Sequence, residues 1–506
     1  MISDDTQPST VELRDLVVDG VRVLHFPDQS GLTEATLIFG VGQRDETLPT
    51  LGTLHALEHA VMAGVRRTPI DINGSVGVST TQFTATGSTT LVSAFLAGVC
   101  EGLADPPTDR LHHEARVLEA EGDGDGTPMS YAAVARYGYR GLGVIDGPGP
   151  GPSGVRAEIV RSVAAQWFSA ANALLVVEGD WLEDLRLPLP GGPRPHHASP
   201  PVRRVPRPSA ITVNGPACEL NLVLPAEPAT LTWLTAAVLD DRLTEALRHE
   251  RGLVYTVDVD PIRIPGGFDV TVRTDPTPDR VGDCVRAMVE TVRALVSDGP
   301  TEAEVTHAKA VLAESLQGRD GEIGRIAKSA IDELIGLPTE PITLSTLASY
   351  DRGAIADQLR HVADDLLYVV DEAVEPDCAS LGLEVIELGP TSPGPLPPGE
   401  VFRPPLLALA LTKDARASRV ALTSEGLAHA FDGRVQRVAW TEVAGVLRDE
   451  DGDLVVYGLD GQAVTVGPTL YKRGQRLVDA VLGNVPGDLV YDAPPDPDLR
   501  AEERAG

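Results

Sequence analysis

The sequence predicts an α+β fold in which one α/β unit occurs twice and a small, mostly β domain follows. Strand and helix patterns before residue 205 recur in similar order between 206 and 390, which indicates a duplicated unit. Two proline-rich stretches, 185–209 and 388–405, read as linkers. Short β-type runs dominate beyond them, closed by one amphipathic segment at 472–485. The predicted parts are 1–205, 206–390, a linker at 391–405, a β domain at 406–491 and a disordered tail at 492–506.

Composition limits the class of protein. The 506 residues suffice for about three domains, and 42% hydrophobic residues can bury a sizeable core. The net charge of −32 argues against nucleic acid or an anionic membrane as a partner. The first residues, MISDDTQPST, lack the features of a signal peptide, and no apolar run approaches the length of a membrane span. We therefore expect a cytoplasmic protein.

The four cysteines, Cys100, Cys218, Cys284 and Cys378, are widely spaced and form no C-x-x-C pair. Single thiols in a reducing compartment are the default interpretation of this pattern. Any bound metal is therefore expected to be held by His and carboxylate groups.

The first unit reads as strands, a central helix and a helical layer. Apolar runs bounded by Asp, Gly and Pro predict strands at 21–26 and 33–42. The apolar segment 51–64 predicts a helix, and 66–77 has the composition of turns. Further elements are predicted as a strand at 78–92, helices at 91–105, 111–122 and 155–172, and a buried strand at 173–181.

The second unit repeats this order. The predicted elements are a strand at 218–226, a long helix at 230–250, strands through residue 274, helices at 277–297, 302–318, 321–335 and 347–367, and a last strand at 381–388. His196 and His197, in the linker before this unit, are expected to be solvated.

The segment HALEH, residues 55–59, is the strongest chemical signal. At about 100° per residue, His55, Glu58 and His59 share one helix face. Two imidazoles one turn apart can bind Zn²⁺, and the Glu can hold and deprotonate a metal-bound water. The order H-x-x-E-H is the inverted zincin signature. A helix with two ordinary half-buried His residues is the alternative, because so short a motif also matches by chance.

A zinc site made by His55 and His59 needs a third protein ligand. Glu114 and Glu121 lie seven residues apart on the predicted helix 111–122 and share a face. The spacing alone leaves both as candidates.

Residues 12–390 resemble the insulinase/pitrilysin family of zinc metalloproteases, and most of all its bacterial members related to mitochondrial processing peptidase. The segments that carry the resemblance are GVRVLHF, GVGQRDET, LGTLHALEHAVMAG, LHHEARVLEAE and ALLVVEGD. The resemblance implies two peptidase-type α/β sandwich domains that form half of a clamshell. It implies one zinc per chain held by His55, His59 and Glu121, with Glu114 orienting the ligands and Glu58 as general base.

The segment LRHERGLVY resembles the part of the family in which an Arg and a Tyr, seven apart, bind the substrate carbonyl; here they are Arg248 and Tyr255. The resemblance implies that Tyr255, with Arg248 assisting, stabilises the developing oxyanion. In relatives of this length two chains enclose a chamber. A homodimer, or a heterodimer with a related chain, is therefore expected, with the Arg/Tyr pair facing the partner's zinc.

The resemblance also implies an edge strand that binds peptide, expected at Gly77, Val78 and Ser79. The implied activity is hydrolysis of short or unfolded peptides. The alternative is a non-catalytic peptidase-fold subunit or scaffold that acts with a related chain. It is favoured by the short spacer between His59 and Glu121 and by Gly77 in place of an expected Asn.

The segment 406–491 resembles a pleckstrin-homology-like barrel, a series of strands capped by one helix. Its few basic residues, among them Arg434, Arg437, Lys472 and Arg473, lie among many acids. We therefore expect it to dock a protein or to stabilise a dimer rather than to bind a membrane.

Overall fold

The computed structural model describes residues 11–28, 31–65, 67–122, 131–145, 147–226, 228–405 and 418–494. The chain divides into two compact units. Unit 1 contains residues 203–386 and, of the described N-terminal residues, 11–14. Unit 2 contains the described residues within 15–202 and from 387 onward, so the C-terminal domain belongs to the same unit as the N-terminal sheet. Among the described helices, none is long and apolar enough to cross a membrane.

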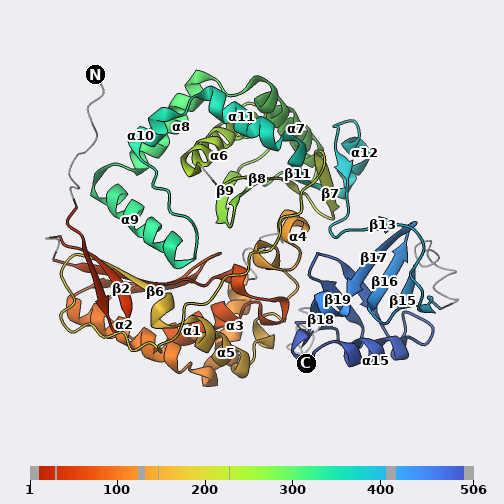
Figure 1. Ribbon diagram of the computed structural model, residues 1–506, viewed down its shortest axis with the longest axis horizontal. Helices are drawn as coiled ribbons and strands as arrows, with labels where there is room; N and C mark the ends of the chain where they lie inside the picture. Colours follow the sequence, from red (N-terminus) through yellow and green to blue (C-terminus); the bar gives the residue numbers. More distant parts are fainter. Residues whose placement is uncertain are drawn as a thin grey trace. The chain divides into compact units, whose positions relative to one another are not determined.

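The N-terminal part of unit 2 is built on a six-stranded sheet with the order β1-β2-β6-β3-β5-β4 (Figure 1). Its strands are β1 (Arg14–Val18), β2 (Val21–Phe26), β3 (Thr33–Phe39), β4 (Asp71–Val76), β5 (Thr81–Gly87) and β6 (Ala173–Glu178). β2 and β6 are parallel, whereas β3 runs antiparallel to both β6 and β5. β4 pairs with β5 alone and forms one edge of the sheet.

Helices cover one face of this sheet, and they are drawn in orange to yellow in Figure 1. They are α1 (Thr53–Val65), α2 (Thr89–Ala104), α3 (Leu111–Gly122) and α5 (Ala157–Trp167). The short α4 (Tyr131–Tyr137) follows α3 in the sequence and lies outside this helical layer (Figure 1). Leu54, Leu57 and Val61 of α1 are buried in the same core as Phe39 and Phe83 of the sheet. The burial of this apolar stripe fixes the rotation of α1 about its own axis. It therefore also fixes the direction of the opposite, polar face.

The edge strand differs from the prediction. β4 lies within the stretch 66–77 that was expected to form turns, and Gly77, Val78 and Ser79 lie in the connection between β4 and β5. The sequence DINGSV has weak strand propensity, so its pairing with β5 over Asp71–Val76 decides its conformation. The edge strand expected at residues 77–79 is therefore corrected to β4.

Unit 1 contains a second six-stranded sheet, with the order β12-β7-β11-β8-β10-β9. Its strands are β7 (Ser209–Val213), β8 (Cys218–Pro225), β9 (Val257–Ile264), β10 (Gly267–Thr274), β11 (Leu367–Asp371) and β12 (Glu384–Val385). β7 and β11 are parallel, and β8 runs antiparallel to β11 and to β10. The order and direction of five strands, β7-β11-β8-β10-β9, thus repeat those of β2-β6-β3-β5-β4 in the first sheet, which supports the predicted duplication. The sixth strands differ, because β1 comes from the start of the first sheet's sequence and β12 from the end of the second's.

The helices of unit 1 follow the predicted order with two corrections. They are α6 (Ala229–Leu243), α7 (Val281–Asp298), α8 (Glu302–Ser315), α9 (Gly318–Leu334), α10 (Leu344–Ser349), α11 (Arg352–Val362) and α12 (Glu375–Cys378). The helix expected at 347–367 is broken because Asp351 caps a new helix by accepting a hydrogen bond from the Ala354 N–H. The helix expected at 230–250 ends in a π-helical turn, Thr244–His249.

The C-terminal domain contains two sheets, ordered β13-β17-β16-β15-β14 and β20-β19-β18-β21, and the helix α15 (Gly474–Asn484). The strands are β13 (Ser392–Pro393), β14 (Glu400–Phe402), β15 (Arg419–Leu422), β16 (Gly426–Phe431), β17 (Arg434–Ala439), β18 (Val443–Arg448), β19 (Leu454–Gly458), β20 (Ala463–Val466) and β21 (Val490–Asp492). Within the described residues these sheets do not close into the expected barrel.

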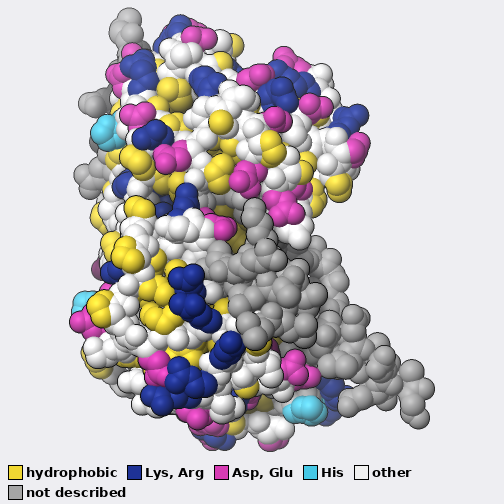
Figure 2. Space-filling model, turned by 90° about the vertical axis from the view of Figure 1, so that its right-hand side faces the viewer, with side chains coloured by type: hydrophobic (Ala, Val, Ile, Leu, Met, Phe, Trp, Pro, Cys, Tyr) yellow, Lys and Arg dark blue, Asp and Glu magenta, His cyan; other side chains and the backbone are white. Residues whose placement is uncertain are grey.

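Two further expectations for unit 2 need correction. The predicted linker 391–405 supplies β13 and β14, because both pair with the first C-terminal sheet. His197 is not solvated: its Nδ1 lies 2.7 Å from Asp45 Oδ1, and its ring lies against Trp167. The strand expected from residue 406 and the tail beyond residue 494 lie outside the described residues. On the face drawn in Figure 2, acidic, basic and apolar side chains of the described residues are interspersed.

Candidate metal centre

The start of α1 is held by a buried carboxylate. Glu46 accepts hydrogen bonds from the backbone N–H groups of Leu54 (2.9 Å) and Gly52 (3.2 Å). A negative group at this position satisfies free N–H groups and complements the helix dipole. Burial raises the pKa of Glu46 to about 7, although the backbone hydrogen bonds act in the opposite direction. Glu46 was not predicted as a site residue, although it lies in the GVGQRDET segment before the helix.

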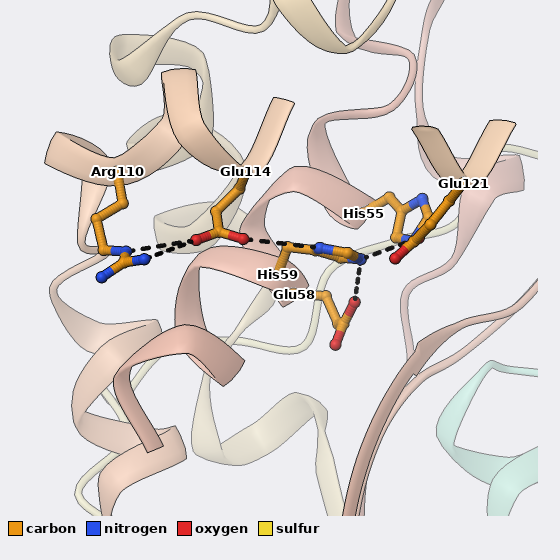
Figure 3. Close-up of polar contacts among 6 residues, drawn as sticks. All are labelled: His55, Glu58, His59, Arg110, Glu114 and Glu121. Carbon is orange, nitrogen blue, oxygen red and sulfur yellow. Dashed lines mark hydrogen bonds and ion pairs between the residues drawn. The ribbon is translucent and has the colours of Figure 1, made fainter. Parts of the chain in front are cut away.

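His55, His59 and Glu121 converge at the contact between α1 and α3 (Figure 3). One potential ligand atom from each side chain lies within 4.8 Å of the others. Glu121 Oε2 is 3.4 Å from His59 Nε2 and 4.0 Å from His55 Nε2. Two imidazole nitrogens and one carboxylate are a donor set that suits catalytic Zn²⁺ and leaves a fourth position open. These residues therefore fit the metal that the motif implies.

The two carboxylates predicted as alternatives occupy different positions. Glu121 faces both imidazoles, whereas Glu114 Oε2 lies on the other side of His59, 4.0 Å from its Nδ1. Arg110 in turn donates hydrogen bonds of 3.3 Å to Glu114 Oε1. Arg110, Glu114 and His59 thus form a chain of polar contacts behind the His59 ring, on the side away from Glu121. Arg110 was not predicted; its position four residues before Glu114 was the available signal.

Glu58 lies beside these groups, and its Oε2 is 3.7 Å from His59 Nε2, the same nitrogen that Glu121 approaches (Figure 3). Burial raises the pKa of Glu58 to about 7, and the negative charge of Glu121 adds to the effect. Burial also lowers the pKa of His55, and the neighbouring His59 acts in the same direction. A carboxyl group with a pKa near neutrality can both accept and donate a proton at physiological pH.

The edge strand β4 passes close to Glu58. A Cβ atom added at Gly74 would overlap the Glu58 carboxylate and crowd Met62. Only glycine leaves this space free, so Gly74 permits the close approach of strand and carboxylate. Gly74 was not predicted as a site residue because the segment was assigned to a turn.

Arg248 and Tyr255 lie together in unit 1. The Arg248 guanidinium lies over the Tyr255 ring, 4.9 Å from its centre. Tyr255 is 76% exposed, and its backbone N–H donates a hydrogen bond of 2.8 Å to Asp275. The stacking fixes an exposed phenol next to a positive charge. The predicted Arg/Tyr pair is thus formed within one chain.

Comparison with known proteins identifies the fold. Residues 154–312 match the family model of the peptidase M16 inactive domain. A search of curated proteins finds no match. Among solved structures, the peptidase M16 inactive domain from Pseudomonas fluorescens aligns with 71% of this chain and 97% of its own, with 16% identity and a TM-score of 0.56. A protease from Helicobacter pylori aligns with 71% of this chain and 99% of its own, with 14% identity and a TM-score of 0.58.

A chain of complex III2 from Candida albicans also aligns, over 72% of this chain and 96% of its own, with 12% identity and a TM-score of 0.54. At these identities the similarity establishes the fold alone. The matched segment 154–312 lies outside the helices that carry His55, His59 and Glu121. The chain therefore has the fold of M16 peptidase proteins, and its middle segment matches the M16 inactive domain.

Proposed function

We propose that this chain is a zinc-dependent endopeptidase that hydrolyses short or unfolded peptides. The observation that carries the proposal is the convergence of His55, His59 and Glu121 within 4.8 Å, beside the buried Glu58. These three side chains would hold the zinc. When bound in such a site, Zn²⁺ supplies a Lewis acid that activates water and polarises a peptide carbonyl.

Glu58 carries the proton in the proposed reaction. Its carboxylate accepts a proton from the attacking water and then donates it to the leaving amine. Its position beside His59 and its pKa of about 7 suit both steps. Glu114 keeps His59 in its orientation, and Arg110 holds Glu114.

We assign Arg248 and Tyr255 to the zinc centre of a partner chain. Tyr255 donates a hydrogen bond to the oxyanion that forms on the substrate carbonyl, and Arg248 adds positive charge. The exposure of Tyr255 and its stacking with Arg248 support this role. Pairing with a second copy or a related chain is supported by the fold shared with a chain of complex III2. The paired chains would enclose a chamber that excludes folded proteins.

A second candidate is a non-catalytic subunit with the same fold. It is favoured by the match of residues 154–312 to a domain described as inactive. Both potential ligand helices, α1 and α3, nevertheless retain their His and Glu residues outside that segment. We therefore place the enzyme first.

Zinc content and peptide hydrolysis separate the two candidates. Protein purified with added zinc is expected to contain about one zinc per chain by mass spectrometry. His59→Ala should lose the zinc. Glu58→Gln should keep the zinc and lose at least about 10²-fold in hydrolysis of a quenched fluorescent peptide. His113→Ala is the matched control, because His113 is an exposed histidine of α3 outside the cluster.

Two results would overturn the proposal that the chain is a zinc peptidase. Protein that binds no zinc in the presence of excess metal would contradict the metal centre itself. Protein that binds zinc through His59 but hydrolyses no unfolded peptide, alone or with a related chain, would establish the non-catalytic candidate.

A further inference from the structure

A cavity of about 690 Å³ opens beside the metal centre, inside unit 2. His55 and Glu121 line one side of it, so any molecule in the cavity lies next to the ligand cluster. Its leucine and proline lining consists of Leu51, Leu118, Pro148, Pro152, Leu447 and Pro494. Leu447 and Pro494 belong to the C-terminal domain. The C-terminal domain therefore forms part of the wall of a space that adjoins the candidate zinc site.

A small, separate apolar core joins the C-terminal domain to the N-terminal part of unit 2 beside the cavity. Leu48, Val144 and Tyr139 pack there against Ala444 and Tyr491. The Tyr491 hydroxyl donates a hydrogen bond of 2.6 Å to the backbone carbonyl of Pro148 in the Gly/Pro-rich loop. The hydrogen bond ties the last strand of the C-terminal domain to the loop that lines the cavity.

Close backbone approaches show that this contact is specific. A Cβ atom at Gly445 of β18 would lie 2.8 Å from Tyr491 and 3.2 Å from Leu48. At Gly149 of the loop, a Cβ would lie 2.8 Å from Leu51, itself a lining residue. Distances below 3.0 Å are not tolerated by side chains in packed protein. Gly445 and Gly149 therefore allow a close approach to Tyr491 and Leu51 that a larger residue would prevent.

The chemistry of the lining defines what the cavity accepts. The described lining residues other than His55 and Glu121 are leucine, proline and glycine. They offer apolar contact and no positive charge, and the volume is in the range of pockets that bind small molecules or side chains. An aliphatic or aromatic side chain gains free energy by leaving water for such a surface, whereas an acidic one would face Glu121.

We propose that this cavity is a specificity pocket for a large apolar side chain of the peptide, next to the bond that is cleaved, and that Leu447 of the C-terminal domain forms a wall of it. The inference rests on the proposed function, because a peptide reaches the pocket only when its carbonyl is bound at the zinc. It assigns the C-terminal domain a direct part in substrate selection.

Binding of two small hydroxamates tests the pocket without catalysis. N-acetyl-leucine hydroxamate and N-acetyl-glycine hydroxamate share the group that anchors on zinc and differ in the side chain. In titration calorimetry with zinc-loaded full-length protein, the leucine compound should bind about tenfold more tightly than the glycine compound. The ratio of the two Kd values isolates the contribution of the pocket.

Leu447→Asp should reduce this ratio to about one, because a carboxylate would replace the apolar wall. Leu447→Met should keep the ratio, since size and apolar character are retained. Leu482→Asp is the matched control: Leu482 is an exposed leucine of α15 in the same domain, outside the lining. Leu447→Ala should lower the ratio of the two Kd values about threefold. This variant keeps the test valid if Leu447→Asp does not fold.

The outcomes distinguish the two proposals. Zinc-bound protein with equal Kd values for both hydroxamates, or with a ratio unchanged by Leu447→Asp and Leu447→Ala, would overturn the pocket alone. Protein that binds neither zinc nor hydroxamate would overturn the proposed function and the pocket with it.

Discussion

The two six-stranded sheets place a helix at the same point of their topology. α1 connects β3 to β4 in unit 2, and α6 connects β8 to β9 in unit 1. Each of these helices contacts a second helix, α1 with α3 and α6 with α8. The first pair meets through His59 and Glu121, whose side chains approach to 3.4 Å. The second pair meets through Arg242 and Glu304, with 2.6 Å between Nη2 and Oε2. A candidate ligand set in one unit thus corresponds to an ion pair in the other.

This difference separates what the fold requires from what the chemistry requires. In unit 1 the equivalent helix α6 carries no histidine, and its buried hydroxyl groups are satisfied by neutral partners. Thr235 donates to Gln358, and Gln358 donates to Thr232. The shared sheet and helix layer therefore form without metal ligands. The two histidines and the carboxylates of unit 2 are additions to a scaffold that the apolar residues already specify.

The largest effect is expected where the edge strand β4 meets Glu58, the proposed general base. Gly74→Ala should displace the Glu58 carboxylate, because the added Cβ would overlap it. Peptide hydrolysis should fall by about 10²-fold, while zinc content stays at the wild-type value. Steady-state kinetics and metal analysis of the same preparation measure both quantities.

Gly64→Ala provides the control for this substitution. Gly64 lies in α1, and a Cβ atom there would meet nothing within 4 Å. This variant should keep full activity and gain slightly in stability, since alanine favours a helix. Equal activities of the two variants would contradict the assigned role of Gly74.

The sequence allowed the repeated unit and most of the candidate site to be predicted. Apolar periodicity identified α1 and α3, and a spacing of seven placed Glu114 and Glu121 on one face of α3. Spacing could not decide between these two carboxylates, because the choice depends on how α3 crosses α1. The resemblance to a family named Glu121, and the structure brings Glu121 within 4.8 Å of both histidines.

The parts that were not predicted depend on tertiary contacts. β4 has weak strand propensity and is held by its pairing with β5, so composition pointed to a turn. Three further site residues, Glu46, Arg110 and Gly74, were missed because their roles depend on contacts formed in the folded chain. Local sequence patterns do not identify the partners in such contacts. The C-terminal wall of the cavity likewise arises from residues more than 300 positions apart in sequence, such as Tyr491 and Pro148.

A second prediction compares two buried acids. Burial raises the pKa of both Glu58 in unit 2 and Glu219 in unit 1 to about 7. Glu219 lies on β8, where Arg273 opposes the shift and one carboxylate oxygen lacks a hydrogen-bond partner. Because folding raises the pKa from 4.5 to about 7, Glu219 does not reduce stability below pH 4.5, and stability is lost as the pH rises from 4.5 through about 7.

Glu219→Gln should therefore stabilise the protein at pH 8 by roughly 2 kcal/mol and have little effect at pH 4. Peptide hydrolysis should be unchanged, because Glu219 serves no catalytic role in the proposal. Urea unfolding at the two pH values measures the difference. If Glu219→Gln instead lowers the free energy of unfolding at pH 8 relative to the wild type, the ionised Glu219 side chain stabilises the fold.

The smallest effect concerns the ion pair that replaces the ligand set in unit 1. Although burial acts to raise it, hydrogen bonds from Arg242 and Thr301 lower the pKa of Glu304 to about 2. The stabilisation is therefore present above pH 4.5 and is lost as the pH falls toward 2. In a double-mutant cycle at pH 7, Arg242→Met and Glu304→Gln should show a coupling of about 1 kcal/mol. Gln at 304 preserves the capping of Thr301, so the cycle isolates the link between α6 and α8. Zinc content should stay unchanged in all three variants, whereas a loss of zinc would show that the two helix pairs are not independent.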